Sequence, residues 1–340
     1  MRVTLAAAPG SRLAAAAEAA GVPLLLLDVR GYVHPGAILR LSRFLRGENV
    51  DLLHAQHSRD LATLVPAMLL AGRRRPIILS KRMGSYIRKK DLLHRFTHRY
   101  VSRILAISEV IHRNVLETLP IEPQRVLTLH DAIDISRFDP ARVDGSGVRK
   151  EFGFTAEQTV VGFVGRFSPG KGHEELLRAA ALLHPGHPGL RLLIVGEPSH
   201  GEEEYARGVR RMAAELGVES IVRFAGFRSD IPAVMAAFDC FAFPSHAESF
   251  GVVLIEAMAM ERAVVSTNCD GILDIMVGEE TGVMVPPKDA GALAKGIERL
   301  IADPALRRMM GIAARRRVLL LFDQERQIDR LQIIYDELFV

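Results

Sequence analysis

Short apolar segments alternate with longer amphipathic segments along the whole chain. Runs rich in Val, Ile and Leu are typical of strands that are buried on both faces of a parallel sheet, and the segments between them have the spacing of helices. Strands are therefore predicted at residues 3–7, 24–29, 51–54, 77–80, 104–108, 126–129, 160–164, 192–195, 222–225, 240–243, 263–266 and 282–285.

This pattern is interrupted once, at residues 139–159, where proline, glycines and charged residues are typical of a linker. Strands separated by helical crossovers predict an α/β fold with two doubly wound, Rossmann-like parallel sheets that face a cleft. We predict one domain over residues 1–138, a second over 160–318, and an apolar C-terminal helix over 319–340 that packs on a domain.

Length and composition agree with this organisation. The chain has 340 residues, of which 49% are hydrophobic and 25% are charged, so it can form two domain cores and is not a disordered chain. No apolar run approaches the ~18 residues that a membrane-spanning helix needs. Two cysteines exclude a disulfide scaffold and a four-cysteine zinc site, and they favour a reducing compartment, so we expect a cytoplasmic location.

Charge is divided unevenly between the two halves. Residues 1–138 carry 21 Lys and Arg against 11 Asp and Glu, whereas residues 139–340 carry 23 against 29. A basic half predicts an anionic partner, although scattered solvated charge is the alternative. The stretch from Lys81 to Arg103 is the most basic, and its interleaved apolar residues predict an amphipathic helix that binds an anionic membrane surface. No nucleic-acid-binding motif accompanies this charge, so we expect no nucleic-acid partner.

The first stretch with chemical potential follows the strand at 160–164. The strand ends at Gly165, after which Arg166 and Lys171 lie on either side of a Pro-Gly turn. Two cations at the carboxyl end of a parallel strand are well placed to hold a diphosphate and to stabilise it as a leaving group. The alternative is a loop with two solvated cations. The glycine spacing differs from that of a Walker loop.

The second stretch follows the strand at 240–243. A polar turn leads into an apolar helix with Ser249 as its predicted N-cap, and a helix N-terminus favours a phosphate. The N–H groups at this terminus belong to Phe250, Gly251 and Val252. At ~1.5 Å per residue, Glu248 and Glu256 are expected to lie about 10–12 Å apart. That spacing favours two contacts along an extended ligand, whereas the alternative is one capping and one exposed glutamate.

These stretches resemble the family-4, or group 1, glycosyltransferases of the GT-B fold, a retaining group that includes many bacterial lipopolysaccharide and polysaccharide enzymes. The matching residues are Gly165, Arg166, Lys171, Gly172, Phe224–Phe227, Asp230, Pro244, Ser245, Glu248, Glu256, Thr281, Gly282, Val285, Pro286 and Asp289. The resemblance implies a retaining hexosyltransferase that moves a sugar from a nucleotide-diphosphate donor to a hydroxyl of an envelope glycan or lipid-linked acceptor.

The resemblance also implies roles for individual residues. Arg166, Lys171 and Glu248 would be the catalytic residues, with the two cations on the diphosphate and Glu248 on the sugar hydroxyls, while Glu256 would bind the ribose. The donor-binding set is Gly165, Arg166, Lys171, Gly226, Phe227, Glu248, Ser249, Phe250, Gly251, Val252 and Glu256. No metal, cofactor or enzymic nucleophile is implied. An enzyme that acts on such acceptors is expected on the inner face of the cytoplasmic membrane.

The resemblance is looser in the first half. His54, His57 and Arg82 are the candidates for contact with the acceptor. The segment 2–6 is similar to the family's second strand, so the first strand, glycine-rich turn and first helix, roughly 30 residues, would be missing. A misassigned start codon and a shortened domain both explain this. Two other functions stay open, a non-catalytic subunit that binds nucleotide sugar and a sugar-nucleotide epimerase of the same fold.

Overall fold

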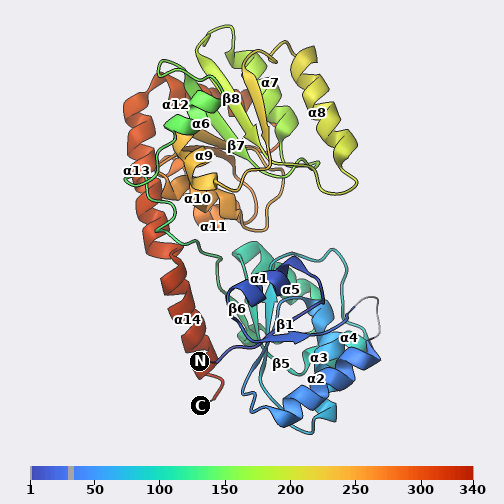
Figure 1. Ribbon diagram of the computed structural model, residues 1–340. Coiled ribbons are helices and arrows are strands. Elements are labelled where there is room, and N and C mark those ends of the chain that lie inside the picture. Colours follow the sequence, from blue (N-terminus) through green and yellow to red (C-terminus); the bar gives the residue numbers. More distant parts are fainter. Residues whose placement is uncertain (1, 30–33, 340) are drawn as a thin grey trace. The chain divides into compact units, whose positions relative to one another are not determined.

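The computed structural model describes residues 2–29 and 34–339 (Figure 1). The chain forms two compact units. Unit 1 comprises Met1–Ile107, Ile111–Thr128 and Ile334–Val340, and unit 2 comprises Ser108–Val110 and Leu129–Ile333. The division therefore falls before the predicted linker, and the end of the chain returns to unit 1.

Unit 1 is built from short strands and helices. Its elements are β1 (Leu5–Ala7), α1 (Arg12–Ala19), β2 (Leu24–Leu26), α2 (Pro35–Gly47), β3 (Leu53–Ala55), the 3₁₀ turn η1 (Ser58–Asp60), α3 (Leu61–Leu70), β4 (Ile77–Lys81), α4 (Leu92–His98), β5 (Val101–Ala106), α5 (Glu109–Thr118), the 3₁₀ turn η2 (Pro123–Arg125) and β6 (Val126–Thr128). The first residues of α5 belong to unit 2.

The strands of unit 1 form two separate parallel ladders rather than the single sheet that was predicted. β1 pairs with β2, and the second ladder has the order β3-β4-β5-β6. In β4, Ile77, Ile78 and Leu79 are all fully buried. Side chains on both faces of this central strand are therefore covered, which is why its sequence is continuously apolar.

Unit 2 holds the larger sheet. Its elements are α6 (Ser146–Glu151), β7 (Thr159–Val164), α7 (His173–Leu183), β8 (Leu190–Val195), α8 (Glu203–Glu215), β9 (Val222–Gly226), α9 (Ile231–Ala237), β10 (Cys240–Phe243), α10 (Val252–Ala259), β11 (Ala263–Thr267), α11 (Ile272–Ile275), β12 (Gly282–Val285), α12 (Ala290–Ala302), α13 (Pro304–Leu321) and most of α14 (Gln324–Asp336).

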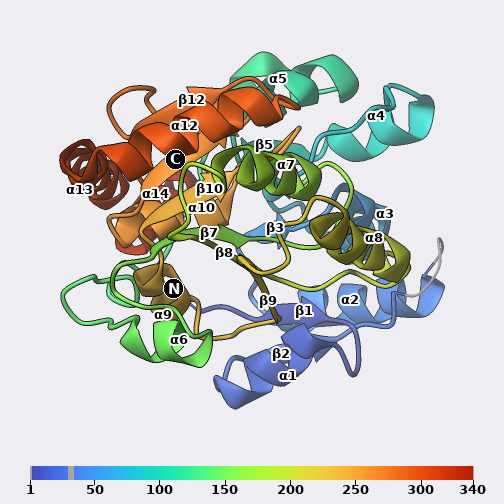
Figure 2. The ribbon, with the colours of Figure 1, turned by 90° about the horizontal axis from the view of Figure 1, so that it is seen from above.

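The six parallel strands of unit 2 have the order β12-β11-β10-β7-β8-β9. This is the doubly wound order, in which the first strand of the unit, β7, lies beside the fourth, β10. Helices α7, α8 and α12 cover one face of the sheet, and α9 and α10 cover the other (Figures 1 and 2). Loops leaving β7 and β10 therefore diverge at their carboxyl ends, and ligands of such sheets bind at that point.

Residues 139–159, the predicted linker, belong to unit 2 and contain α6. Val148 of α6 and Phe154 behind it are buried. Gly145 lies so close to α9 that a Cβ there would approach the backbone N of Ala237 to 2.3 Å. The segment packs on α9 because its few apolar residues are spaced to face one side. Its glycines and charged residues concealed this packing in the sequence.

Two helix predictions are wrong in their bounds. The C-terminal residues form α13 and α14, which separate at Phe322 and Asp323, instead of one helix over 319–340. Phe322 is fully buried and its N–H closes α13, whereas Leu320, Leu321 and Ile328 are exposed. The buried stripe of α13, which comprises Met310, Ala314 and Val318, thus ends at Phe322, where the helix breaks.

The predicted amphipathic helix from Lys81 to Arg103 is also wrong. Only α4, Leu92–His98, is helical there, while Lys81 ends β4 and Arg103 lies in β5. Asp91 caps α4 by accepting hydrogen bonds from the N–H groups of Leu93 and His94 at 3.1 and 3.2 Å. Sheet pairing of Val101 and Arg103 with β4 overrides the helical spacing of the sequence. Within residues 2–29 and 34–339, no helix is both long and apolar enough to cross a membrane.

Candidate active site

The loop after β7 carries both predicted cations. Gly165 prolongs the strand, because its N–H donates to the carbonyl of Val195 at 2.9 Å. Arg166 is exposed and its Nη1 donates to Ser199 Oγ at 3.1 Å, in the loop after β8. Lys171 is half-buried at the other end of the loop. The two cations therefore lie at the carboxyl edge of the sheet, as predicted from the spacing.

Gly172 allows the loop after β7 to touch the loop after β10. Its φ is +81°, in the left-handed region, and a Cβ there would lie 2.1 Å from the carbonyl oxygen of Pro244. The N–H of His246 donates to the carbonyl of Gly170 at 2.8 Å. Only glycine fits at position 172, because it has neither the Cβ nor the conformational restriction of other residues.

This contact brings Lys171 and Glu248 together. Lys171 Nζ lies 2.7 Å from Glu248 Oε2, with the side chains 24% and 16% exposed. The loop around Glu248 is held by its own backbone, because its N–H donates to Asp270 Oδ2 at 3.2 Å and its carbonyl accepts from Gly271 N–H at 2.9 Å. A cation and an acid from two different loops thus converge at the switch point between β7 and β10.

Helix α10 begins later than predicted. It starts at Val252, and its N-cap is Gly251 with φ +107°, so the prediction of Ser249 as N-cap is wrong. Phe250 is buried and stacks on His130, with ring centroids 5.5 Å apart. The carbonyl of Ser249 accepts a hydrogen bond from Ser108 Oγ at 2.6 Å. These anchors hold the chain ahead of the helix, and the left-handed turn falls on the glycine.

Glu256 lies on α10 and is half-buried. Burial raises its pKa to about 7, and the charge of Arg137 opposes this rise only in part. A carboxyl with such a pKa changes charge near neutral pH. Two further predicted residues lie at the end of β9, where Gly226 has φ +69° and the side chain of Phe227 is 71% exposed.

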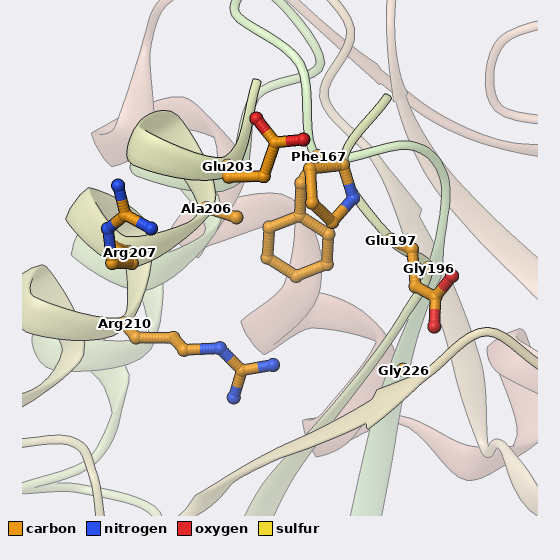
Figure 3. A pocket seen from close by; sticks show the side chains of 9 residues that line it. Phe167, Gly196, Glu197, Glu203, Ala206, Arg207, Arg210 and Gly226 are labelled. Carbon is orange, nitrogen blue, oxygen red and sulfur yellow. The ribbon is translucent and has the colours of Figure 1, made fainter. Parts of the chain in front are cut away.

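A pocket of about 450 Å³ opens between α8 and the carboxyl ends of β8 and β9 (Figure 3). Its lining comprises Phe167, Gly196, Glu197, Pro198, Glu203, Ala206, Arg207, Arg210 and Gly226. Arg166 donates to Ser199, and the residue before Ser199, Pro198, lines the pocket, so the loop that holds Arg166 continues into the pocket wall. Its volume falls in the range of ~300–1,000 Å³ that is usual for small-molecule sites.

Two arginines of this pocket were missed by the sequence analysis. Arg210 reaches from α8 toward the strand that ends at Gly226, and its guanidinium lies 4.5 Å from the ring centroid of Phe224 (Figure 3). Arg207 pairs with Glu204 at 2.7 Å. Both arginines sit on one face of a strongly amphipathic helix, and this three-residue spacing is the signal that the sequence contained.

The three candidates in unit 1 have different surroundings. His54 is half-buried and lies 2.6 Å from Tyr335 Oη through Nδ1 and 2.8 Å from Ser80 Oγ through Nε2. Burial, with a smaller effect from Arg82, lowers the pKa of His54 to about 4, so the ring is neutral. His57 is exposed ahead of η1, and its N–H donates to Asp60 Oδ2 at 2.9 Å. Arg82 is exposed beyond β4 and near enough to His54 to affect its charge.

In the part of the chain that the structure describes, no group of three or more His, Cys, Asp and Glu side chains is arranged to hold a metal ion.

Comparison with known proteins identifies the family. The family model of group 1 glycosyl transferases matches residues 147–317, and the model of glycosyltransferase family 4 matches residues 1–137. D-inositol 3-phosphate glycosyltransferase from Salinispora arenicola is 31% identical over 300 residues, which are 85% of this chain and 64% of that protein. The chain thus spans somewhat less than two thirds of the length of this relative.

Solved structures share the fold. A glycosyltransferase from Rickettsia africae has a TM-score of 0.89 at 20% identity and covers 99% of this chain and 90% of its own. The Anabaena protein Alr3699/HepE, in complex with UDP and glucose, has a TM-score of 0.86 at 23% identity and covers 98% and 91%. The predicted fold class, two Rossmann-like α/β domains of the GT-B type, is therefore confirmed, and the chain belongs to the group 1, family 4 glycosyltransferases.

Proposed function

We propose that the chain is a retaining, metal-independent hexosyltransferase that uses a nucleotide-diphosphate sugar. The contact between Lys171 and Glu248 carries this proposal, because it brings a cation and an acid side by side at the switch point of the sheet. Arg166 adds a second positive charge from the same loop as Lys171. The Anabaena neighbour, whose structure contains UDP and glucose, supports a donor of this class.

Each part of the donor has a matching part of the site. Its diphosphate lies between Arg166 and Lys171, and its ribose hydroxyls bind Glu256. The nucleoside enters the pocket that is lined by Phe167, the residue after Arg166. Sugar hydroxyls bind Glu248, which is held in place through its backbone by Asp270 and Gly271. Glu248 follows β10, the two cations follow β7 and the pocket lies at the ends of β8 and β9, and these strands are neighbours in the sheet in that order. A donor carries its sugar, diphosphate and nucleoside in the same order, which supports the assignment.

The chemical step is one substitution at the anomeric carbon. The acceptor oxygen bonds to that carbon on the face from which the diphosphate departs, the bond from carbon to phosphate oxygen breaks, and the hydroxyl proton passes to the departing phosphate. Arg166 and Lys171 stabilise the negative charge that grows on the diphosphate. The two cationic side chains supply the charge compensation that a divalent metal supplies in metal-dependent enzymes. Turnover should therefore continue in the presence of a chelator.

The acceptor is a hydroxyl of an envelope glycan or of a lipid-linked precursor. Relatives are named for transfer to D-inositol 3-phosphate, so an assay compares that cyclitol with glycan and lipid-linked acceptors. Unit 1, in which His54 is held by Tyr335 and Ser80, supplies the groups for this choice.

We also propose that unit 1 binds the inner face of the cytoplasmic membrane. An exposed surface between β4 and the end of α4, the 83–95 surface, combines apolar and basic side chains. It comprises Met83, Tyr86, Ile87, Arg88, Lys90, Leu92, Leu93 and Arg95. Tyr86 and Leu92 are 105% and 85% exposed, and such apolar groups beside Lys and Arg fit an anionic bilayer interface.

The transfer proposal is tested with Arg166→Ala. Loss of one group that stabilises the leaving charge costs about 3–4 kcal/mol in the barrier, or roughly 10²–10³ in kcat. Purified protein is assayed for transfer and donor hydrolysis with a panel of nucleotide sugars, with and without EDTA. The matched control is Arg178→Ala, which removes an exposed arginine of α7 and should leave kcat unchanged.

A folded Arg166→Ala protein with wild-type turnover would contradict the role of Arg166. Nucleotide-sugar binding without transfer or hydrolysis would favour a non-catalytic binding subunit, and a change in the sugar without transfer would favour an epimerase.

A further inference from the structure

A histidine in the turn after β10 contacts a buried acid in the first turn of α7. The two residues lie close in sequence to Glu248 and Lys171. His246 Nε2 lies 3.0 Å from Glu175 Oε2, with the side chains 23% and 9% exposed. Both atoms are inaccessible to solvent, and among the described residues neither has a hydrogen-bond partner, because the contact between them is short but lacks hydrogen-bond geometry. The ion pair therefore compensates the burial of both atoms.

Glu175 is an unusual residue for its position. It lies in the first turn of α7, and its neighbours on the helix, Leu176 and Leu177, are fully buried in the core of unit 2. Removing a carboxylate from water is unfavourable unless a partner compensates it. His246 is that partner, so the contact holds the turn from β10 against α7.

His246 is attached to the loop after β7 at a second point. Its backbone N–H donates to the carbonyl of Gly170, the residue before Lys171, at 2.8 Å. Glu248 follows His246 by two residues in the same turn. The backbone of His246 contacts Gly170, just before Lys171, and its ring contacts Glu175, four residues after Lys171. His246 thus holds the turn that carries Glu248 at two points around Lys171.

We propose that the contact between Glu175 and His246 is a positioning link that sets Lys171 relative to Glu248. The link is the close contact between the His246 ring and the Glu175 carboxylate, and it acts by placing the turn after β10. Neither residue touches substrate. This inference rests on the proposed transfer reaction, because it assigns residues that prepare the site for that reaction.

The test replaces each member by a residue without polar side-chain atoms, Glu175→Leu and His246→Leu, and combines the two. Each single variant should lower kcat about tenfold while donor KM stays within threefold, because displaced charges affect the transition state more than the bound donor. The double variant should be no slower than the slower single one, since either change breaks the same contact.

Two controls separate positioning from general loss of structure. Glu175→Gln keeps a side chain of the same length with a polar end beside His246 and should restore kcat to within threefold of wild type. His187 and Glu298 form a comparable pair, with 3.4 Å between Nε2 and Oε1, between the turn before β8 and α12. His187→Leu and Glu298→Leu should leave kcat unchanged.

Folded Leu variants with wild-type kcat, or single losses that multiply in the double variant, would overturn the link. If Glu175→Leu does not fold, His246→Leu with wild-type kcat overturns it alone, because half of the link is then absent without effect. Wild-type protein that neither binds nor turns over any nucleotide sugar would refute the proposed function itself, and that result is read before any variant is compared.

Discussion

The acidic residues at the donor site differ in how their charge is balanced. Glu248 is compensated directly by Lys171 at 2.7 Å. Glu256, on α10, has only the charge of Arg137 to oppose burial, and its pKa rises to about 7. A carboxyl with a raised pKa favours the folded state while it is protonated and opposes it once it is ionised.

Glu256 therefore gives the stability a pH dependence of known sign. The folded state keeps the proton up to about pH 7, whereas the unfolded chain releases it near the ordinary value of about 4.5. The free energy of unfolding should fall as the pH rises between these values and then level off. Glu256→Gln removes this slope, and the difference from wild type should reach at most about 3 kcal/mol above pH 7.

Urea denaturation of both proteins from pH 4.5 to 8 measures this difference. Taking the difference cancels the titration of groups that both proteins share, such as His54. A difference that does not change with pH would show that Glu256 has an ordinary pKa.

At the scale of elements, the site depends on how closely two loops approach each other. The loop after β7 and the turn after β10 meet where Gly172 faces the carbonyl of Pro244. Lys171 precedes this point by one residue, so the position of its ammonium group follows the position of the backbone. Local conformation at one glycine thus controls a contact between residues from two elements.

Gly172→Ala should displace the Lys171 loop. A left-handed φ costs a non-glycine residue about 1–2 kcal/mol, and the added Cβ would also clash with Pro244. We expect the free energy of unfolding to fall by more than this amount and kcat/KM to fall at least tenfold. Thermal unfolding and donor turnover measure the two effects.

Gly153→Ala is the matched control. Gly153 has a φ of +70°, but a Cβ there would meet nothing within 4 Å. Gly153→Ala should lower the free energy of unfolding by the conformational cost alone and should retain wild-type kcat/KM. Equal losses of turnover in the two variants would remove the clash with Pro244 as the cause.

At the scale of the whole molecule, basic charge is concentrated in the first part of the sequence. Residues 1–138 carry a formal charge of +10, from 21 Lys and Arg against 11 Asp and Glu. Unit 1 also exposes the apolar residues of the 83–95 surface. Attraction to anionic lipid and burial of apolar groups in the interface would act on the same surface, which makes membrane binding sensitive to both salt and apolar substitution.

Sedimentation with vesicles tests this binding. Wild-type protein should pellet with vesicles that contain anionic lipid, less so at high salt, and not with neutral vesicles. Each Lys or Arg near such a surface contributes ~1 kcal/mol, so Arg88→Gln with Lys90→Gln should weaken binding roughly 30-fold. Tyr86→Ser with Leu92→Ser should weaken it as well.

Leu182→Ser is the control. Leu182 is 63% exposed on α7, which belongs to unit 2, whereas the 83–95 surface belongs to unit 1. It should sediment as wild type does. Pelleting that is independent of salt and of the 83–95 variants would count against the membrane proposal.

Sequence alone determined the approximate strands, the fold class and the loops that carry the candidate site residues. Each of the twelve predicted segments overlaps a strand, because short apolar runs between helical segments mark strands, most clearly those of unit 2 that are buried on both faces. Arg166, Lys171, Glu248 and Glu256 were found because they directly follow such strands or interrupt an apolar helix. Those signals are local, and hydrophobic patterning records them.

Tertiary structure decided the remainder. The link between Glu175 and His246, the pocket under α8, and the start of α10 at Val252 depend on contacts between elements distant in sequence. The segment from Lys81 to Arg103 had helical spacing, but its last residues belong to β5 and pair with β4. A periodic pattern shows which side of an element is apolar, whereas only packing decides what that side touches and where the element stops.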